Sequence, residues 1–192
     1  MKKIIAATKN KNKVREFKEI LPDYEIITQE EAGIDIDVEE TGTTFKENAL
    51  LKAQAIFEKT GVPSLADDSG LEVYALGGEP GVYSARYGGE GLDDFGRLKL
   101  VLEKMNDVSD ELRGAQFVCA IAFVTKDKIY EAEGVCEGVL THEPKGENGF
   151  GYDPIFYVPE KGKTAAEMTS EEKNEISHRG KALRKLSEII EN

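Results

Sequence analysis

Apolar residues along this chain form two kinds of pattern, which are short buried-type runs and longer stretches with helical spacing. The short runs predict strands at 3–8, 24–28, 117–123 and 129–135. The last two runs are separated by the polar pair Lys126-Asp127, which predicts a hairpin. A further apolar run at 62–65 leads into Ala66-Asp67-Asp68-Ser69-Gly70, where we expect the strand to end and the chain to turn.

Helical spacing predicts a first helix that begins near Lys13 and ends before Pro22. The segment Thr44-Phe45-Lys46-Glu47 matches a capping box, so we expect a second helix to open there. Gly61 follows the last apolar position of this helix and predicts its end.

Two more helices follow in the second half of the chain. Asp93 or Asp94 is expected to cap one of them, in which Phe95 and the apolar residues after it form the buried face. The other covers the apolar positions between 182 and 190. Because strands and helices are interspersed and at least one hairpin is present, we predict an α/β fold in which helices flank a mixed sheet.

Composition narrows the class of protein. The 192 residues, of which 40% are hydrophobic, suit a single domain, 1–192, that can fold as two lobes around a cleft. A net charge of −12 argues against nucleic-acid binding and against an anionic membrane surface, although lysines can still cluster locally on a small polyanion. Cys119 and Cys136 form no metal-type pair, and without a secretory signal they fit a free-thiol, cytoplasmic protein.

The adjacent acids Asp67 and Asp68 are the first candidate site. Neighbouring carboxylates raise each other's pKa unless a cation or hydrogen-bond donors share the site. A strand that ends in Asp-Asp-Ser-Gly could therefore hold a hard cation, with Gly70 permitting a sharp turn. The alternative is a plain acidic turn, since these residue types are the usual ones in turns.

Two further segments carry charged groups at the ends of predicted elements. Thr8, Lys9, Asn10, Lys11, Asn12 and Lys13 join the first strand to the first helix, where backbone N–H groups and lysines can bind phosphate. A solvated basic loop is the competing interpretation, and the Walker pattern is absent. Glu40 and Lys52 flank the start of the second helix; they are either surface charges or, with the acid pair, part of a Mg²⁺ site.

A glycine and aromatic loop, Gly149-Phe150-Gly151-Tyr152-Asp153-Pro154, could stack on a flat base and accept hydrogen bonds from ring N–H groups. The alternative is that Phe150 and Tyr152 pack the loop onto the core. Lys173 and Ser177-His178-Arg179-Gly180 precede the last helix and could donate to a purine carbonyl oxygen. Basic groups ahead of a helix oppose its dipole, which favours a ligand over capping.

Six segments in order resemble the inosine triphosphate pyrophosphatase family over nearly the whole chain. They are Ala7-Thr8-x-Asn10-x-x-Lys13, Glu40-Thr41-Gly42-x-Thr44-Phe45-x-Glu47-Asn48-Ala49, Ala66-Asp67-Asp68-Ser69-Gly70-Leu71, Pro80-Gly81-Val82-Tyr83-Ser84-Ala85-Arg86-Tyr87, Gly149-Phe150-Gly151-Tyr152-Asp153-Pro154 and Ser177-His178-Arg179-Gly180. Each segment alone is a weak signal. Together they are specific.

The resemblance implies a long curved mixed sheet, two lobes around a central substrate cleft, and a homodimer. It implies Mg²⁺-dependent hydrolysis of ITP, dITP or XTP to the monophosphate and pyrophosphate, through attack of water on the α-phosphorus. By position, Glu40 and Asp68 serve the metal, Asp68 accepts the proton, and Asp67 supports them. The residues from Thr8 to Lys13, with Lys52, bind phosphates, and Lys13 aids catalysis. Ser69 contacts substrate, and the base is held by Phe150, Gly151, Tyr152, Asp153, Lys173, His178 and Arg179.

Two other functions remain open at this point. One is a septum-inhibitor-type pyrophosphatase, related in fold but acting on modified pyrimidine triphosphates. The other is a nucleotide sensor that retained the pocket and lost turnover. Which of Asp67 and Asp68 is the base is also open, because a coupled acid pair titrates as a unit.

Overall fold

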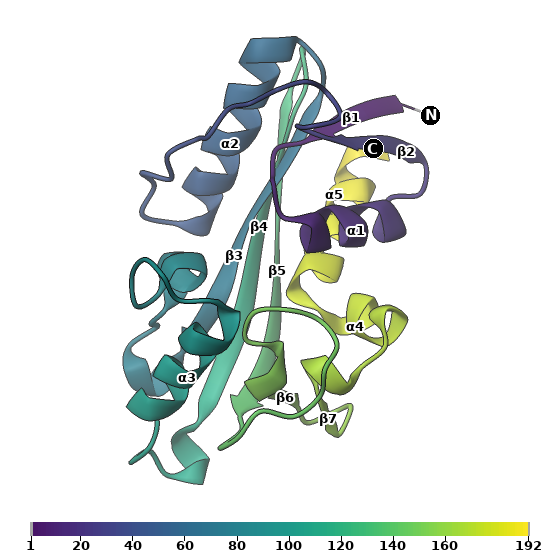
Figure 1. Ribbon diagram of the computed structural model, residues 1–192. Coiled ribbons are helices and arrows are strands. Elements are labelled where there is room, and N and C mark those ends of the chain that lie inside the picture. Colours follow the sequence, from purple (N-terminus) through teal and green to yellow (C-terminus); the bar gives the residue numbers. More distant parts are fainter. Residues whose placement is uncertain (1, 192) are drawn as a thin grey trace. The chain divides into compact units, whose positions relative to one another are not determined.

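The computed structural model describes residues 2–191 (Figure 1). Within this range seven strands form one sheet in the order β2-β1-β3-β4-β5-β6-β7. The strands are β1 (Lys2–Ala6), β2 (Tyr24–Thr28), β3 (Ser64–Val73), β4 (Gly114–Val124), β5 (Ile129–Leu140), β6 (Phe156–Val158) and β7 (Lys163–Thr164). β1 pairs in parallel with β2 and β3, whereas β6 pairs antiparallel with β5 and β7. The sheet is therefore mixed, which confirms the predicted α/β class.

The α-helices of the described chain are α1 (Lys11–Ile20), α2 (Phe45–Thr60), α3 (Asp94–Lys104), α4 (Ser170–Ile176) and α5 (His178–Glu191). Single turns or short runs of 3₁₀ helix lie at Tyr74–Leu76, Gly81–Arg86, Asp110–Leu112, Asp153–Ile155 and Ala165–Glu167. No helix in residues 2–191 combines the length and the apolar character needed to cross a membrane.

The chain is organised in two compact units. The first takes in the described residues up to Asp68, then Cys119–Gly134, and the residues from His178 onward. The second takes in Ser69–Val118 and Val135–Ser177. The three long strands β3, β4 and β5 each contribute residues to both units.

In the first unit helices cover both faces of the sheet (Figure 1). Side chains of a strand alternate between faces, so Ile4 and Ala6 of β1 pack with residues of α1 and α5, whereas Ile5 and Ala7 pack with α2. The same alternation continues in β3, where Leu65 belongs to the α1/α5 side and Ala66 to the α2 side. This alternation decides where the acidic residues that follow will point.

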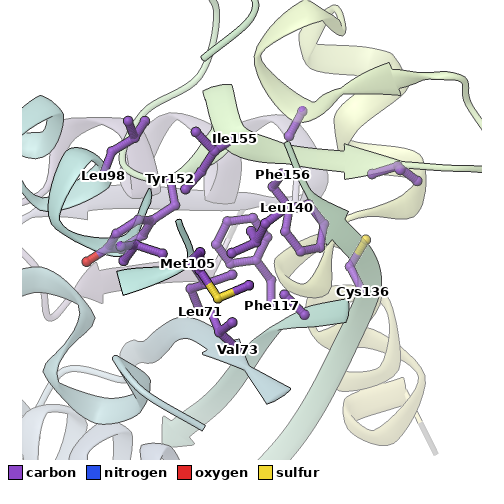
Figure 2. Packing of buried hydrophobic residues seen from close by; sticks show 14 of the residues in the cluster. Leu71, Val73, Leu98, Met105, Phe117, Cys136, Leu140, Tyr152, Ile155 and Phe156 are labelled. Carbon is purple, nitrogen blue, oxygen red and sulfur yellow. The ribbon is translucent and has the colours of Figure 1, made fainter. Parts of the chain in front are cut away.

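The second unit has one apolar core, built around the aromatic rings of β4 and β6 (Figure 2). The rings of Phe117 and Phe156 lie 4.3 Å apart between centroids, at an interplanar angle of 42°. Leu71 and Val73 from β3 and Tyr152 from the loop before β6 complete the same cluster. The loop that contains Tyr152 is therefore tied directly to the core.

Helix ends largely follow the predicted capping chemistry. α1 begins at Lys11 rather than near Lys13, because the Asn10 side chain accepts the first free backbone N–H groups of the helix. The capping box of α2 and the left-handed Gly61 at its end are both confirmed. The predicted burial of Phe95 is wrong: its side chain is 54% exposed on α3, and Lys99 lies over its ring.

The predicted hairpin is confirmed, with β4 and β5 adjacent in the sheet and joined by a turn in which the Thr125 N–H donates to the Lys128 carbonyl. The segment ahead of the last helix differs from the prediction. Lys173 lies in α4, and His178 and Arg179 form the first turn of α5 rather than a loop before it.

Candidate active site

Asp67 and Asp68 lie in the middle of β3, so the predicted turn at this pair is wrong. β3 continues to Val73 without a turn at Gly70, because the apolar residues on both sides of the pair are buried in the sheet. Adjacent residues of a strand point to opposite faces. Asp67 therefore falls on the side of Leu65, towards α1 and α5, and Asp68 on the side of Ala66, towards α2.

Asp67 is completely buried among cationic groups. Nε and Nη2 of Arg179 donate to its Oδ2 at 3.0 and 2.9 Å, and Nζ of Lys13 lies 3.1 Å from its Oδ1. Nη1 of Arg179 donates to Glu16, and the Cys119 thiol lies 3.8 Å from Asp67 Oδ2. Burial by itself would raise the pKa of Asp67, but Lys13 and Arg179 outweigh it and hold this pKa far below its usual value.

Asp68 has a different set of partners. The buried amide of Asn48 donates to its Oδ2 at 3.1 Å, and Nζ of Lys52 donates to its Oδ1 at 3.4 Å. The same ammonium donates to Oε1 of Glu40 at 2.7 Å, so Lys52 contacts both carboxylates. Burial raises the pKa of Asp68, and Glu40 adds to this while Lys52 opposes it.

Asn48 and Gly42 hold the segment of Glu40 against α2. The backbone N–H of Gly42 donates to Asn48 Oδ1 at 2.8 Å, which leaves the amide nitrogen to face Asp68. A Cβ on Gly42 would lie 2.6 Å from this Oδ1 and 2.7 Å from Cβ of Glu47. Only glycine therefore permits the approach that brings Glu40 to Lys52 and Asp68.

The two acids lie in different ionic surroundings. Asp67 lies against Lys13 and Arg179, and Arg179 also pairs with Glu16, whereas Asp68 and Glu40 both contact Lys52. The described residues contain no cluster of three or more His, Cys, Asp or Glu side chains able to hold a metal. Mg²⁺ needs only one or two carboxylates when water and substrate phosphates complete its shell. The carboxylate oxygens of Glu40 and Asp68, which both reach Lys52, fit that requirement.

The segment from Thr8 to Lys13 forms the N-terminal cap of α1. Thr8 Oγ1 accepts the N–H of Asn10, and Asn10 Oδ1 accepts the N–H groups of Asn12 and Lys13 at 2.9 and 3.3 Å. Lys9, Asn10 and Lys11 are exposed, and Lys9 lies 3.6–3.7 Å from two exposed acids of the loop 35–37. Of the three lysines, only Lys13 turns towards the acid pair.

In the second unit the Phe150 loop is closed by a buried ion pair. Nζ of Lys173 donates to Asp153 Oδ2 at 2.7 Å and lies 4.7 Å from the centre of the Phe150 ring. The N–H of Phe150 donates to the same oxygen at 2.9 Å. Gly149 has φ of +73°, and a Cβ there would lie 2.1 Å from Asp153 Oδ2, so the tight loop requires glycine.

Tyr152 and Gly151 fasten this loop on its other side. Tyr152 is buried in the core of the second unit, and its hydroxyl donates to the carbonyl of Ser84 at 2.7 Å. Burial raises the pKa of this hydroxyl. The N–H of Gly151 donates to Asp94 Oδ2 at 3.1 Å. The packing alternative holds for Tyr152, while the half-buried Phe150 ring lies against the ammonium of Lys173.

The other expected substrate contacts are Ser69, His178 and Arg179. Ser69 follows Asp68 in β3 and is half-buried. His178 and Arg179 are buried in the first turn of α5, where a Cβ on Gly134 of β5 would lie 2.2 Å from the His178 carbonyl oxygen. The backbone of α5 thus packs directly on the sheet, and the guanidinium of Arg179 reaches Asp67 and Glu16.

Comparison with known proteins places the chain in a family. The Ham1 family model matches residues 4–189. The chain belongs to the Ham1 family. Relatives from Bacillus licheniformis and Bacillus subtilis, each named dITP/XTP pyrophosphatase, are 50% identical over 194 residues, covering 100% of this chain and 99% and 98% of their own lengths.

Solved Ham1 structures have the same fold. The Ham1 protein of Staphylococcus aureus is 46% identical, with a TM-score of 0.88 over 99% of this chain and 98% of that one. A nucleoside-triphosphatase / dITP/XTP pyrophosphatase from Mycobacterium abscessus is 44% identical, with a TM-score of 0.77 over 96% of this chain and 98% of that one. The family expected from the six segments is confirmed.

Sequence reasoning missed several residues that hold the two acids in place. Asn48 is a polar residue on the otherwise apolar face of α2, which is the signal that could have identified it. Glu16 likewise sits between the buried Val14 and Phe17 of α1. Asp94 has the local pattern of a helix cap, and nothing in that pattern connects it with Gly151.

Proposed function

We infer that this chain is a dITP/XTP pyrophosphatase, which hydrolyses non-standard purine nucleoside triphosphates, including ITP, to the monophosphate and pyrophosphate. Half-identity to proteins of that name over their full length supports the activity. The observation in the structure that carries the assignment is the convergence of Glu40 and Asp68 on Lys52.

Glu40 and Asp68 are the residues that would hold Mg²⁺. A bound Mg²⁺ neutralises charge on the phosphates and on the departing pyrophosphate. Lys52 and Lys13 supply further positive charge on the two sides of β3. The exposed residues between Thr8 and Lys13 add polar and cationic groups at the N-terminus of α1, where the helix dipole favours phosphate.

Asp68 is our candidate for the proton acceptor. Water attacks the α-phosphorus, its proton passes to a carboxylate oxygen of Asp68, and the bond from the α-phosphorus to the bridging oxygen breaks, which releases pyrophosphate. The Oδ1 atom of Asp68 has one long contact, 3.4 Å, to Lys52, whereas both oxygens of Asp67 lie close to Arg179 or Lys13, so Asp68 is the acid whose oxygen is better able to accept a proton. Asp67 is held as an anion by Lys13 and Arg179, so we assign it a supporting role.

We assign recognition of the base to the Phe150 loop of the second unit. Phe150 offers a ring face for stacking, Lys173 a donor for a 6-oxo group, and Asp153 an acceptor for ring N–H groups. A 6-amino group would leave such a donor unmatched, which selects against adenine. Gly151 and the buried Tyr152 shape this loop, and Ser69 is assigned to substrate next to Asp68.

The test is pyrophosphate release from dITP, XTP, ITP, GTP, ATP and a modified pyrimidine triphosphate, each with Mg²⁺ and with EDTA. We expect fast, Mg²⁺-dependent turnover of the first three. Asp68→Asn should lower kcat by about 10²-fold or more while nucleotide binding is largely kept. Glu72→Gln, on the same strand, is the matched control and should retain activity.

Each alternative has its own signature in this assay. Equal rates on ATP and ITP would refute the assignment of the base-reading residues. Preference for the modified pyrimidine would favour the septum-inhibitor type, and binding without turnover would favour a sensor.

We also propose that the enzyme is a homodimer located in the cytoplasm. Light scattering of the purified protein would test the dimer, and a monomeric mass would contradict it.

A further inference from the structure

Arg179 and Glu16 form a buried charge network that the proposed chemistry does not use. Arg179 is 1% exposed and Glu16 4% exposed. The guanidinium donates from Nε and Nη2 to Asp67 and from Nη1 to Glu16. A side chain so enclosed, with all three of its nitrogens engaged, is poorly placed to reach a base.

The network ends at Lys13, whose side chain is partly exposed. Arg179 donates to Asp67 Oδ2 and the Lys13 ammonium forms an ion pair with Oδ1, so the groups form a chain from Glu16 through Arg179 and Asp67 to Lys13. The Lys13 side chain is 14% exposed, whereas that of Asp67 is 0% exposed. Lys13 is therefore the member of the chain that a bound anion can meet.

We propose that Glu16 and Arg179 are positioning residues, which fix Asp67 and through it hold the ammonium of Lys13 in place for the triphosphate. This inference rests on the proposed function. Two carboxylates and two cations balance in the network, and the planar guanidinium fixes the angle between Glu16 and Asp67. Loss of Glu16 leaves Arg179 with one acidic partner fewer and releases this angle.

The fold supplies the close approach that the network requires. Cβ atoms on Gly134 would lie 2.2 Å from the His178 carbonyl and 2.6 Å from the Ala182 backbone nitrogen. The first turn of α5 thus packs against the backbone of β5, which keeps Arg179 at a fixed depth. A buried ion network is weak support for stability by itself, since apolar replacements are often neutral. Orientation of Lys13 is the function that the geometry favours.

The experiment measures binding of inorganic pyrophosphate by calorimetry in EDTA, which removes the metal contribution, together with kcat and KM for dITP and dATP in Mg²⁺. Lys13→Met is the reference and should weaken pyrophosphate binding about 10- to 100-fold. Glu16→Gln and Arg179→Lys should weaken it about five-fold. The double variant Glu16→Gln/Lys13→Met should bind no more weakly than Lys13→Met, because the network acts through that lysine. Glu19→Gln, on the exposed side of α1, is the matched control.

The outcomes separate the inference from the proposed function. Absence of both pyrophosphate binding and dITP turnover in the unaltered protein would overturn both. Normal pyrophosphate affinity in Glu16→Gln, with turnover intact in the unaltered protein, would overturn this inference alone, as would full additivity in the double variant. The ratio of dITP to dATP turnover should stay within two-fold in Glu16→Gln. Its collapse would mean that the network reads the base and would overturn the positioning role.

Discussion

Replacement of Asn48 by Asp tests the hydrogen bonds that hold Asp68, with almost no change in side-chain shape. The Gly42 N–H donates to Asn48 Oδ1, so the amide nitrogen must face Asp68, 3.1 Å from its Oδ2. In Asn48→Asp that nitrogen becomes a second carboxylate oxygen. Lys52 cannot neutralise it, because its ammonium already serves Glu40 and Asp68.

The expected loss of stability follows from the 3.1 Å distance between the side chains of Asn48 and Asp68. Two unit charges 3.1 Å apart repel by about 5 kcal/mol at an effective dielectric constant of about 20. Taking up one proton at pH 7 relieves the repulsion and costs about 4 kcal/mol for an aspartate of ordinary pKa. The smaller value sets the limit, so Asn48→Asp should lower the free energy of unfolding by about 4 kcal/mol at pH 7. For a chain of this length the melting temperature should fall by about 8–16 °C.

The stability penalty of Asn48→Asp should depend on pH, and its direction follows from the pKa shift. The shared site raises the folded-state pKa of one acid above its unfolded value, so the penalty is complete above the folded pKa. It should shrink by about 1.4 kcal/mol per pH unit as the pH falls towards about 4. Urea unfolding of variant and unaltered protein in the same buffers measures it, with Gln54→Glu on α2 as the matched amide-to-acid control. A pH-independent loss below about 1 kcal/mol would refute the contact between Asn48 and Asp68.

Three further predictions concern packing and reactivity. Gly134→Ala places a Cβ against the His178 carbonyl and should lower the free energy of unfolding by about 2 kcal/mol or more, which a lower melting temperature would show. Gly96→Ala in α3 is the control and should be nearly neutral, because the atoms nearest to its Cβ belong to side chains. Equal effects of the two substitutions would contradict the close packing of α5. Arg113 donates to backbone carbonyls, so Arg113→Met should lower the free energy of unfolding, measured in urea, by about 3 kcal/mol. Arg113→Lys should recover less than half of this loss, and a neutral Arg113→Met would count against those hydrogen bonds. The Cys119 thiol is buried and its pKa is raised, so a thiol reagent should label it only as fast as the protein unfolds, and rapid labelling of native protein would disprove its burial.

Local sequence patterns predicted the structure correctly where both hydrogen-bonding residues lie within one short segment. The capping box of α2 needs only Thr44 and Glu47, which are three residues apart, and both hydrogen bonds form as expected. The failure at Phe95 has a different cause. Its place on an apolar helical face predicts burial. The buried residues of α3 are Leu98 and Val101, however, and Phe95 in the first turn of the helix is exposed.

The order of residue types was enough to indicate the Ham1 family and the α/β class, because residue types at characteristic spacings are local facts. It did not reveal that Asp67 and Asp68 have different surroundings. That difference depends on a strand in place of the expected turn, since only a strand sends neighbouring side chains to opposite faces of a sheet. One acid thereby meets Arg179 and Lys13, which lie more than fifty residues away in the chain, and the other meets Asn48 and Lys52. Burial and charge then move their pKa values in opposite directions, which tertiary structure alone decides.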